Sequence, residues 1–300
     1  MCTDSGAAQR AGVGNGPDPI ISGERRPLGM PRAIRHHMLS PWPPIRSALQ
    51  HLSSVVWLLV HTVEEMGDRV VRGRFPFRLA IFFEQTDRTG VGSIPLVSLV
   101  SFFIGLTMAL LTGYQLQTFG QERLVPALVG IAFTRELGPL MTGIMVAARI
   151  GAAYTAELGT MTVSEEVEAI EAMGIGPLRF LVSPRVLAVF LLLPCLVVVS
   201  NITAMAGAAL ISRWAFDISF RGFFETALEN LLIRDIIAGT VKSFLFGLII
   251  GLVSCYKGLT VRGGAAGVGD ATTSSVVTAI TTVIGFDTLC NIVLVALFDK

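Results

Sequence analysis

Four ionisable side chains lie inside long apolar stretches of this 300-residue sequence: Arg135, Glu136, Lys242 and Asp287. A charged group in the hydrocarbon core of a membrane is costly unless it is paired or solvated, so such residues mark tight structural contacts or function. Two of these groups are basic and two are acidic, so their charges balance. The sequence therefore predicts a network of ion pairs within the apolar region.

The order of these charges limits how they can pair. Arg135 and Glu136 are adjacent, so on an α-helix their side chains diverge by about 100° and do not face one another. A rise of ~1.5 Å per residue places all four groups at similar depths in their segments. We predict that Glu136 pairs with Lys242 and Arg135 with Asp287, and the exchanged assignment stays open. Such a network either only fixes the helix packing or also reorganises during function.

One further carboxyl group raises the question of catalysis. Gly267–Asp270 spells GVGD, which fits the GxGD pattern of intramembrane aspartyl proteases. That chemistry needs two carboxyl groups that share a proton. Asp287 lies 17 residues further along the same segment, roughly 25 Å away on a helix, so the two cannot meet within one subunit. We expect no catalytic residue and no enzymatic activity in this chain.

The composition around these residues is that of a membrane protein. Hydrophobic residues make up 52% of the chain and charged residues only 15%, whereas soluble domains are nearer to one quarter charged. Five segments approach the ~20 residues that cross a bilayer; they are Ile94–Leu116, Leu124–Ala153, Val186–Ile211, Ile236–Tyr256 and Thr273–Phe298. The sequence predicts an all-α integral membrane protein with five transmembrane helices in a transmembrane region at residues 94–298.

Other classes of ligand find little support in the composition. A net charge of +1 without a basic, aromatic-rich surface predicts no binding of nucleic acid. The four cysteines form no CxxC motif and no Cys/His cluster, so we expect no metal site and no bound cofactor. No GxxxxGK[ST] motif occurs in the sequence, so this chain cannot supply a P-loop, and any ATP must be hydrolysed by a separate partner chain.

Small residues predict where helices approach closely. Gly105, Ala109 and Gly113 share one face of the first span, and Gly247 with Gly251 forms GxxxG in the fourth. Helices in membranes associate through such small-residue faces. Each face serves either a contact within the subunit or a contact between subunits, and the sequence leaves both open.

The loop between the second and third spans carries the clearest polar pattern. Thr162 followed three residues later by Glu165 is a capping box, and Gly174 is placed to end the helix that follows. The apolar residues Val163, Val167, Ile170 and Met173 share one face of this helix. Its acidic residues suit the positive end of the helix dipole; they are Glu165, Glu166, Glu168 and Glu171. We predict a short amphipathic helix that docks on a partner.

The N-terminal region differs from the rest of the chain. Residues 1–45 are rich in Gly, Pro, Ser and Arg, which predicts a disordered cytoplasmic tail. Residues 46–90 carry an apolar helical stripe followed by arginines, which favours helices lying in the membrane interface. A helix packed on a soluble partner is the alternative for this stretch.

Several motifs together resemble one family. EAIEAMG (Glu168–Gly174) is similar to the EAA loop of ABC-importer permeases, with Ile170 in place of a second alanine. TRELGPL, AARIGAAYTAELGTM, EEVEAIEAMGIGPLRFLVSPR, VKSFLFG and GFD follow in order and at ordinary spacings over residues 80–300. This series closely resembles the MlaE/YrbE permeases of bacterial MCE lipid-transport systems.

The resemblance implies a homodimer with a permease domain at residues 46–300, five transmembrane helices per subunit and a cytoplasmic coupling helix at Val163–Met173. Two ABC ATPase subunits would dock on that helix, and an MCE-domain protein would bind on the far side. The implied substrate is a phospholipid or related lipid in a cavity between subunits. The four buried charges would lie near that cavity and line or gate it.

Charge distribution also predicts the orientation of the chain. Placing the arginine-rich N-terminal region in the cytoplasm puts the loops after the second and fourth spans there too, with the C-terminus in the periplasm. The resemblance places the chain in the bacterial inner membrane. The alternative function, an ion-coupled secondary transporter, would also use buried charges, but such folds often contain paired repeats, and none is visible in this sequence.

Overall fold

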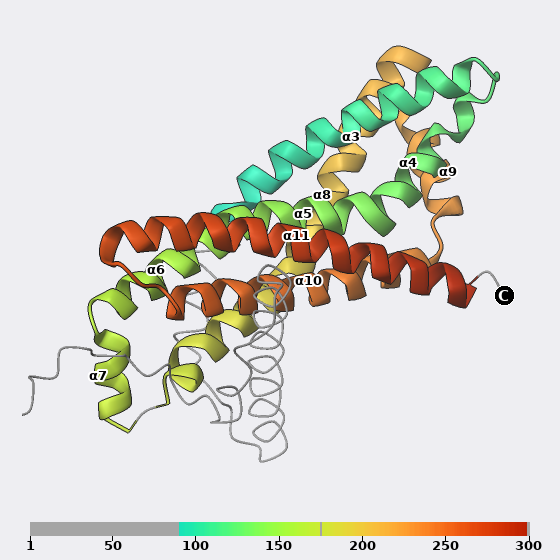
Figure 1. The fold of residues 1–300 in the computed structure, drawn as a ribbon. Helices are drawn as coiled ribbons and strands as arrows, with labels where there is room; N and C mark the ends of the chain where they lie inside the picture. Colours follow the sequence, from blue (N-terminus) through green and yellow to red (C-terminus); the bar gives the residue numbers. More distant parts are fainter. Residues whose placement is uncertain (1–89, 175, 299–300) are drawn as a thin grey trace, which may run out of the picture. The chain divides into compact units, whose positions relative to one another are not determined.

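The computed structural model describes residues 90–174 and 176–298 of the chain. All regular structure in these ranges is helical, which confirms the predicted all-α class (Figure 1). The predicted tail at residues 1–45 lies outside the described residues, and so do the predicted interfacial helices at residues 46–90 apart from their last residue.

The described residues contain five helical segments that are long and apolar enough to cross a membrane. They are Val91–Gln117, Glu122–Val163, Phe180–Phe216, Ile233–Leu259 and Gly264–Leu294. This result confirms the five predicted spans and extends most of them. The added turns are polar or glycine-rich, as in Gly264–Thr272, so an analysis based on apolar runs stops short of the true helix ends.

Most spans are built from one long helix, and the second is composite. The first contains η2 (Val91–Ser93) and α3 (Ile94–Gln117), and the third contains η6 (Leu178–Val182) and α8 (Ser183–Phe216). The fourth is α10 (Ile233–Leu259) and the fifth is α11 (Gly264–Phe298). The second span contains η3 (Glu122–Leu124), α4 (Val125–Ala132), η4 (Phe133–Leu137), α5 (Gly138–Val146), η5 (Ala147–Gly151) and α6 (Ala152–Val163).

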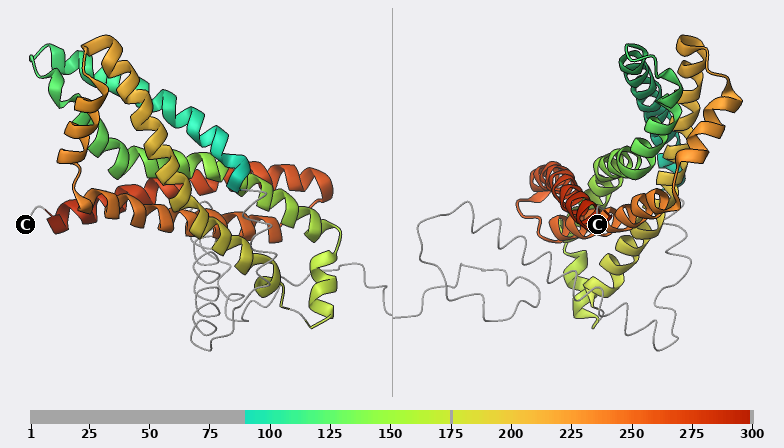
Figure 2. Two further views of the ribbon diagram at one scale, coloured as in Figure 1. Left: turned by 180° about the vertical axis from the view of Figure 1, so that it is seen from behind. Right: turned by 90° about the vertical axis from the view of Figure 1, so that its right-hand side faces the viewer.

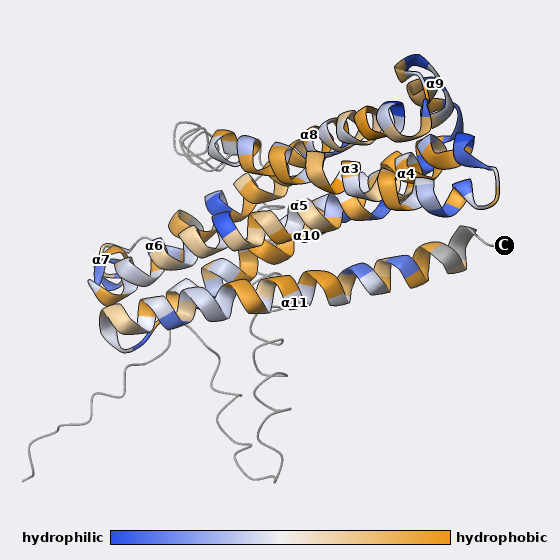
Figure 3. Cartoon of the chain, turned by 90° about the horizontal axis from the view of Figure 1, so that it is seen from above, coloured by the Kyte–Doolittle hydropathy of each residue, from blue (hydrophilic) through white to orange (hydrophobic). Residues whose placement is uncertain are grey.

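Two short helices connect the spans at opposite ends of the bundle. The helix α7 (Glu166–Ala172) follows α6, and α9 (Phe220–Asn230) joins α8 to α10. Figures 1 and 2 show α7 at one end of the long helices, and α9 at the other end with the C-terminal end of α11. Hydrophilic residues gather at these connectors, while the long helices between them are mostly hydrophobic (Figure 3).

The first and third spans pack closely because glycines face backbone. A Cβ added at Gly105 would lie 2.1 Å from the Ala204 carbonyl oxygen, and one at Gly207 would lie 2.2 Å from the Phe102 carbonyl oxygen. The side chains of Ser101 and Ser200 hydrogen-bond between the same two helices at 2.7 Å. The predicted small-residue face of α3 therefore serves a contact within the subunit.

The GxxxG pair of α10 also packs inside the subunit. A Cβ at Gly247 would lie 2.8 Å from the Val189 carbonyl oxygen, and one at Gly251 would lie 3.1 Å from Val186 Cα. Both contacts are made with α8. The structure thus settles the choice that the sequence left open: both predicted glycine faces hold α8 within one subunit.

An apolar core joins α8 and α10 to the second and fifth spans. Among its fully buried members are Tyr154, Leu193, Phe246, Ile250 and Val283. The first and fifth spans are the least buried of the five and leave large apolar side chains exposed. Their outer faces are therefore available to lipid or to another protein chain.

Candidate functional site

The segment that carries Arg135 and Glu136 is a π-helical turn. Pro139 has no N–H group, so the Arg135 carbonyl lacks the partner that an α-helix would provide. The Gly138 N–H instead bonds to the Phe133 carbonyl, five residues back. The widened turn absorbs the proline, and the helix continues without a break as α5.

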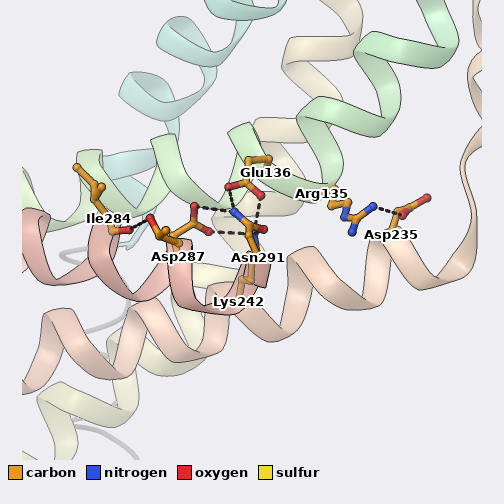
Figure 4. Close-up of polar contacts among 8 residues, drawn as sticks. Arg135, Glu136, Asp235, Lys242, Ile284, Asp287 and Asn291 are labelled. Atoms are coloured by element: carbon orange, nitrogen blue, oxygen red, sulfur yellow. Dashed lines mark hydrogen bonds and ion pairs between the residues drawn. The ribbon is translucent and has the colours of Figure 1, made fainter. Parts of the chain in front are cut away.

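Lys242 lies at the centre of a buried polar cluster formed by three spans (Figure 4). Its ammonium nitrogen lies 2.5 Å from Glu136 Oε2 on η4 and 2.9 Å from Asp287 Oδ1 on α11. It also donates to Asn291 Oδ1 at 2.6 Å. Lys242 is only 2% exposed, so the three oxygen atoms replace the water that an ammonium group would otherwise bind.

The predicted pair of Glu136 and Lys242 is confirmed, and the structure adds Asn291 to it. Asn291 donates to Glu136 Oε1 at 2.6 Å while it accepts from Lys242. We did not predict its role. The available signal was spacing, since Asn291 lies one helical turn after Asp287 and thus on the same face of α11.

The predicted pair of Arg135 and Asp287 is wrong. Arg135 Nη1 lies 3.9 Å from Asp235 Oδ1 in the first turn of α10, whereas Asp287 binds Lys242. The sequence analysis overlooked Asp235, which is 4% exposed. It precedes Lys242 by seven residues, or about two helical turns, so both side chains project from one face of α10.

Asp235 changes the charge balance of the site. The cluster now contains three carboxyl side chains, Glu136, Asp235 and Asp287, and two basic side chains, Arg135 and Lys242. Asp235, Lys242 and Asp287 are buried, and Glu136 and Arg135 are partly exposed. Arg135 interacts with Asp235, so Lys242 alone balances the charges of Glu136 and Asp287. The predicted balance of two charges of each sign therefore does not hold.

The acidic loop contains the predicted helix, with a different start. Thr162 is still inside α6, where its hydroxyl donates to the Leu158 carbonyl at 2.8 Å. Glu165 precedes α7 with a left-handed backbone and makes no side-chain cap, so the predicted capping box is wrong. Gly174 follows the helix with φ +77° and ends it, as predicted.

Only part of the predicted apolar face of α7 is buried. Val167 is 3% exposed and packs on Leu158, Leu181 and Val186 of the same chain, with Ile170 against the same cluster. Val163 and Met173 are exposed, at 39% and 67%. The acidic side chains Glu166, Glu168 and Glu171 are also exposed. Val167 therefore anchors α7 to its own subunit, and the acidic side is the one open to a partner.

Arg185 connects the first turn of α8 to α6 of the second span. Its guanidinium lies 3.3 Å from Glu157 Oε2, donates to the Leu181 carbonyl at 2.9 Å and lies 6.0 Å from the centre of the Tyr154 ring. Arg185 is 5% exposed, so these contacts hold the start of α8 against α6. Arg185 lies one residue before the predicted third span, and no local pattern predicted this contact.

Comparison with known proteins identifies the family. The profile of the family described as Permease MlaE matches residues 82–293. This chain belongs to the MlaE permease family. The match covers all five spans, α7 and the charge cluster, and it agrees with the resemblance seen in the motifs.

Curated relatives of this MlaE-family chain include ABC transporter permeases. A probable ABC transporter permease protein of Rickettsia felis is 36% identical over 68% of this chain and 79% of its own length. Another, from Synechocystis, is 32% identical over 81% and 88% of the two chains. The chloroplastic protein TRIGALACTOSYLDIACYLGLYCEROL 1 of Arabidopsis thaliana is 36% identical over 70% of this chain and 59% of its own.

Family membership defines the class of this MlaE permease. It is a multi-pass membrane protein and the transmembrane permease component of an ABC transporter, and that class implies an ATPase partner. Asp287 does not lie beside Asp270 of the GxGD sequence, so the two cannot share a proton within one subunit. Asp270 is an exposed residue of α11, and Asp287 lies 17 residues further along the same helix.

Proposed function

We propose that this chain forms the membrane pathway of an ATP-driven lipid transporter in the bacterial inner membrane. Two copies would pair, each with an ABC ATPase subunit bound at α7. An MCE-domain protein would bind at the opposite end of the bundle and exchange phospholipid or a related lipid with the cavity between the copies. Membership of the MlaE permease family is the observation that carries this proposal.

The lipid substrate is supported by chemistry and by one relative. The Arabidopsis relative is named for trigalactosyldiacylglycerol, a glycolipid. The first and fifth spans expose large apolar side chains such as Phe103, Leu111, Ile284 and Ile292. Surfaces of this kind suit acyl chains or a second copy of the chain. The charge cluster lies where the second, fourth and fifth spans meet and would contact the polar end of a lipid.

The proposed orientation places α7 in the cytoplasm, where ATP is available. The C-terminal end of α11 then faces the periplasm, because five spans put the two ends of the region on opposite sides. The chain itself would bind no cofactor, and ATP would be bound by the partner.

Pairing of two copies cannot use the glycines of α3 and α10, since α8 covers them. The outer face of α11 is free within the subunit, and a Cβ at Gly285 would meet nothing within 4 Å.

Purification of the chain with its natural partners in mild detergent tests this function. We expect a P-loop ATPase and an MCE-domain protein to copurify, and mass spectrometry of the extracted lipids to show phospholipid or a related lipid above the level of a control membrane protein. Reconstituted with the ATPase, the complex should transfer labelled lipid only when ATP is hydrolysed. Transfer driven by an ion gradient without ATP would contradict the proposal.

Charge reversal on α7 should separate ATPase binding from folding. Glu168→Lys combined with Glu171→Lys changes two exposed side chains, so membrane insertion and thermal stability should stay close to those of the parent chain. If the ATPase presents basic groups to this surface, copurification should be lost, because like charges across an interface are strongly unfavourable.

A matched control lies at the other end of the bundle. Glu229→Lys reverses an exposed charge on α9 and should leave ATPase copurification unchanged. Retention of the ATPase by the doubly reversed chain would remove α7 as its docking site. Substitution of Val167 is unsuitable for this purpose, because Val167 packs inside its own subunit.

A further inference from the structure

The cluster around Lys242 has one carboxyl group too many for its cations. Among the described residues, the ionisable side chains at the cluster are Arg135 and Glu136 on η4, Asp235 and Lys242 on α10, and Asp287 with the nearby thiol of Cys290 on α11. The adjoining α8 contributes no charged side chain between Arg185 and Arg213, and α3 contributes none. Full ionisation of the acids would leave a net charge of −1.

Burial makes such a net charge unfavourable. Lys242 is 2% exposed, Asp235 4% and Asp287 5%, while the side chains of Glu136 and Arg135 are 31% and 35% exposed. Ions in an apolar region cost several kcal/mol unless they are compensated. Arg135 is directed to Asp235, so its charge is already balanced. Glu136 and Asp287 both contact Lys242, at 2.5 Å and 2.9 Å. Two carboxylates that share one cation repel, and such pairs commonly retain a proton.

The contacts distinguish the two carboxyl groups. Both oxygens of Glu136 accept short bonds, from Asn291 Nδ2 at 2.6 Å and from Lys242 at 2.5 Å. Asp287 Oδ2 accepts one long hydrogen bond, from Asn291 Nδ2 at 3.4 Å. Its Oδ1 forms an ion pair with the Lys242 nitrogen at 2.9 Å, yet it is buried and accepts no hydrogen bond of good geometry. Glu136 therefore accepts two short hydrogen bonds, whereas Asp287 is the more weakly hydrogen-bonded of the two carboxyl groups.

We propose that this cluster is a proton-binding site, in which one proton resides on Asp287 when the protein is at rest. The proton makes the cluster neutral. A neutral Asp287 also requires fewer hydrogen-bond donors than a carboxylate, which agrees with the unsatisfied Oδ1. Since the site joins η4, α10 and α11, loss of the proton would weaken the contact between the second and fifth spans by adding a repulsive charge. This inference rests on the charge cluster and does not depend on the identity of the transported lipid.

Infrared difference spectroscopy of the full chain in lipid bilayers tests the proposal directly. A protonated carboxyl group has a carbonyl stretching band distinct from that of a carboxylate, and the band shifts when H₂O is exchanged for D₂O. We expect such a band at neutral pH in the parent chain. Asp287→Asn should remove it, and Asp270→Asn, which alters an exposed residue on the same helix, should leave it unchanged.

Glu136→Gln provides a second test if Asp287→Asn fails to fold. With one carboxyl group replaced by an amide, Lys242 can balance the remaining one, so the band should also be lost in this variant. Persistence of the same band in both folded variants would overturn the proposal. Absence of any exchangeable carboxyl band from the parent chain would overturn it as well, and a dependence of the parent's thermal stability on Na⁺ or K⁺ would then point to a bound cation instead.

Discussion

Replacement of Lys242 by methionine is expected to prevent stable folding of the permease. The substitution keeps the length of the side chain and removes the cation that contacts both Glu136 and Asp287. Leaving buried charge without its partner costs about 3–5 kcal/mol, a large part of the 5–15 kcal/mol by which typical domains are stable. We expect little monodisperse protein in detergent and a strongly lowered melting temperature in what remains.

The matching control removes the acids as well. Lys242→Met combined with Glu136→Gln and Asp287→Asn leaves a neutral cluster, and neutral replacements of buried ion pairs are often tolerated. This triple variant should regain much of the lost stability. If Lys242→Met alone were as stable as the parent chain, the cluster would have no role in holding the three spans together.

Exchange of the two confirmed partners should not rescue the protein. Glu136→Lys with Lys242→Glu restores opposite charges between η4 and α10, but it also places a carboxylate where Lys242 meets Asp287. A carboxylate at position 242 cannot donate to Asp287 and Asn291 as the ammonium group does, so a large part of the defect should remain. The three-way contact thus predicts a result that a simple ion pair would not.

The sequence allowed half of this site to be predicted. Apolar length defined the five spans, and the cost of buried charge correctly linked Glu136 to Lys242. The error at Arg135 arose because Asp235 stands beside Arg234 at the start of a span, where a charge is expected in water. Its burial depends on the packing of α10 against the second span, which no local pattern reports.

Local patterns failed in a different way at α7. Thr162 and Glu165 have the spacing of a capping box, but α6 continues through Thr162 because its hydroxyl can bond within the helix. The apolar spacing at Val167 correctly indicated a buried face. It could not distinguish burial within the subunit from burial against a partner, and the packing on Leu158 and Val186 decides for the subunit. The π-turn before Pro139 likewise needed the three-dimensional structure.

Gly105→Val is expected to separate the first span from the third. An added Cβ would lie 2.1 Å from the Ala204 carbonyl oxygen and 2.7 Å from Ala204 Cα. These are backbone atoms in the middle of α8, so no side-chain rotation can make room. Overpacking typically costs about 1–3 kcal/mol and can cost more where the neighbour cannot move. Helices in a membrane also lose their main attraction when close packing is lost.

The hydrogen bond between Ser101 and Ser200 provides a direct measurement of this separation. These hydroxyls lie 2.7 Å apart between α3 and α8, so cysteines introduced at both positions, in a chain without its native cysteines, should form a disulfide in high yield. Gly105→Val should sharply reduce that yield. Gly285→Val is the matched control, because a Cβ there meets nothing within 4 Å in the subunit, and its disulfide yield should equal that of the parent. An unchanged yield in Gly105→Val would mean that α3 can shift along α8 without detaching, and the glycine contact would then not be what holds the first span in place.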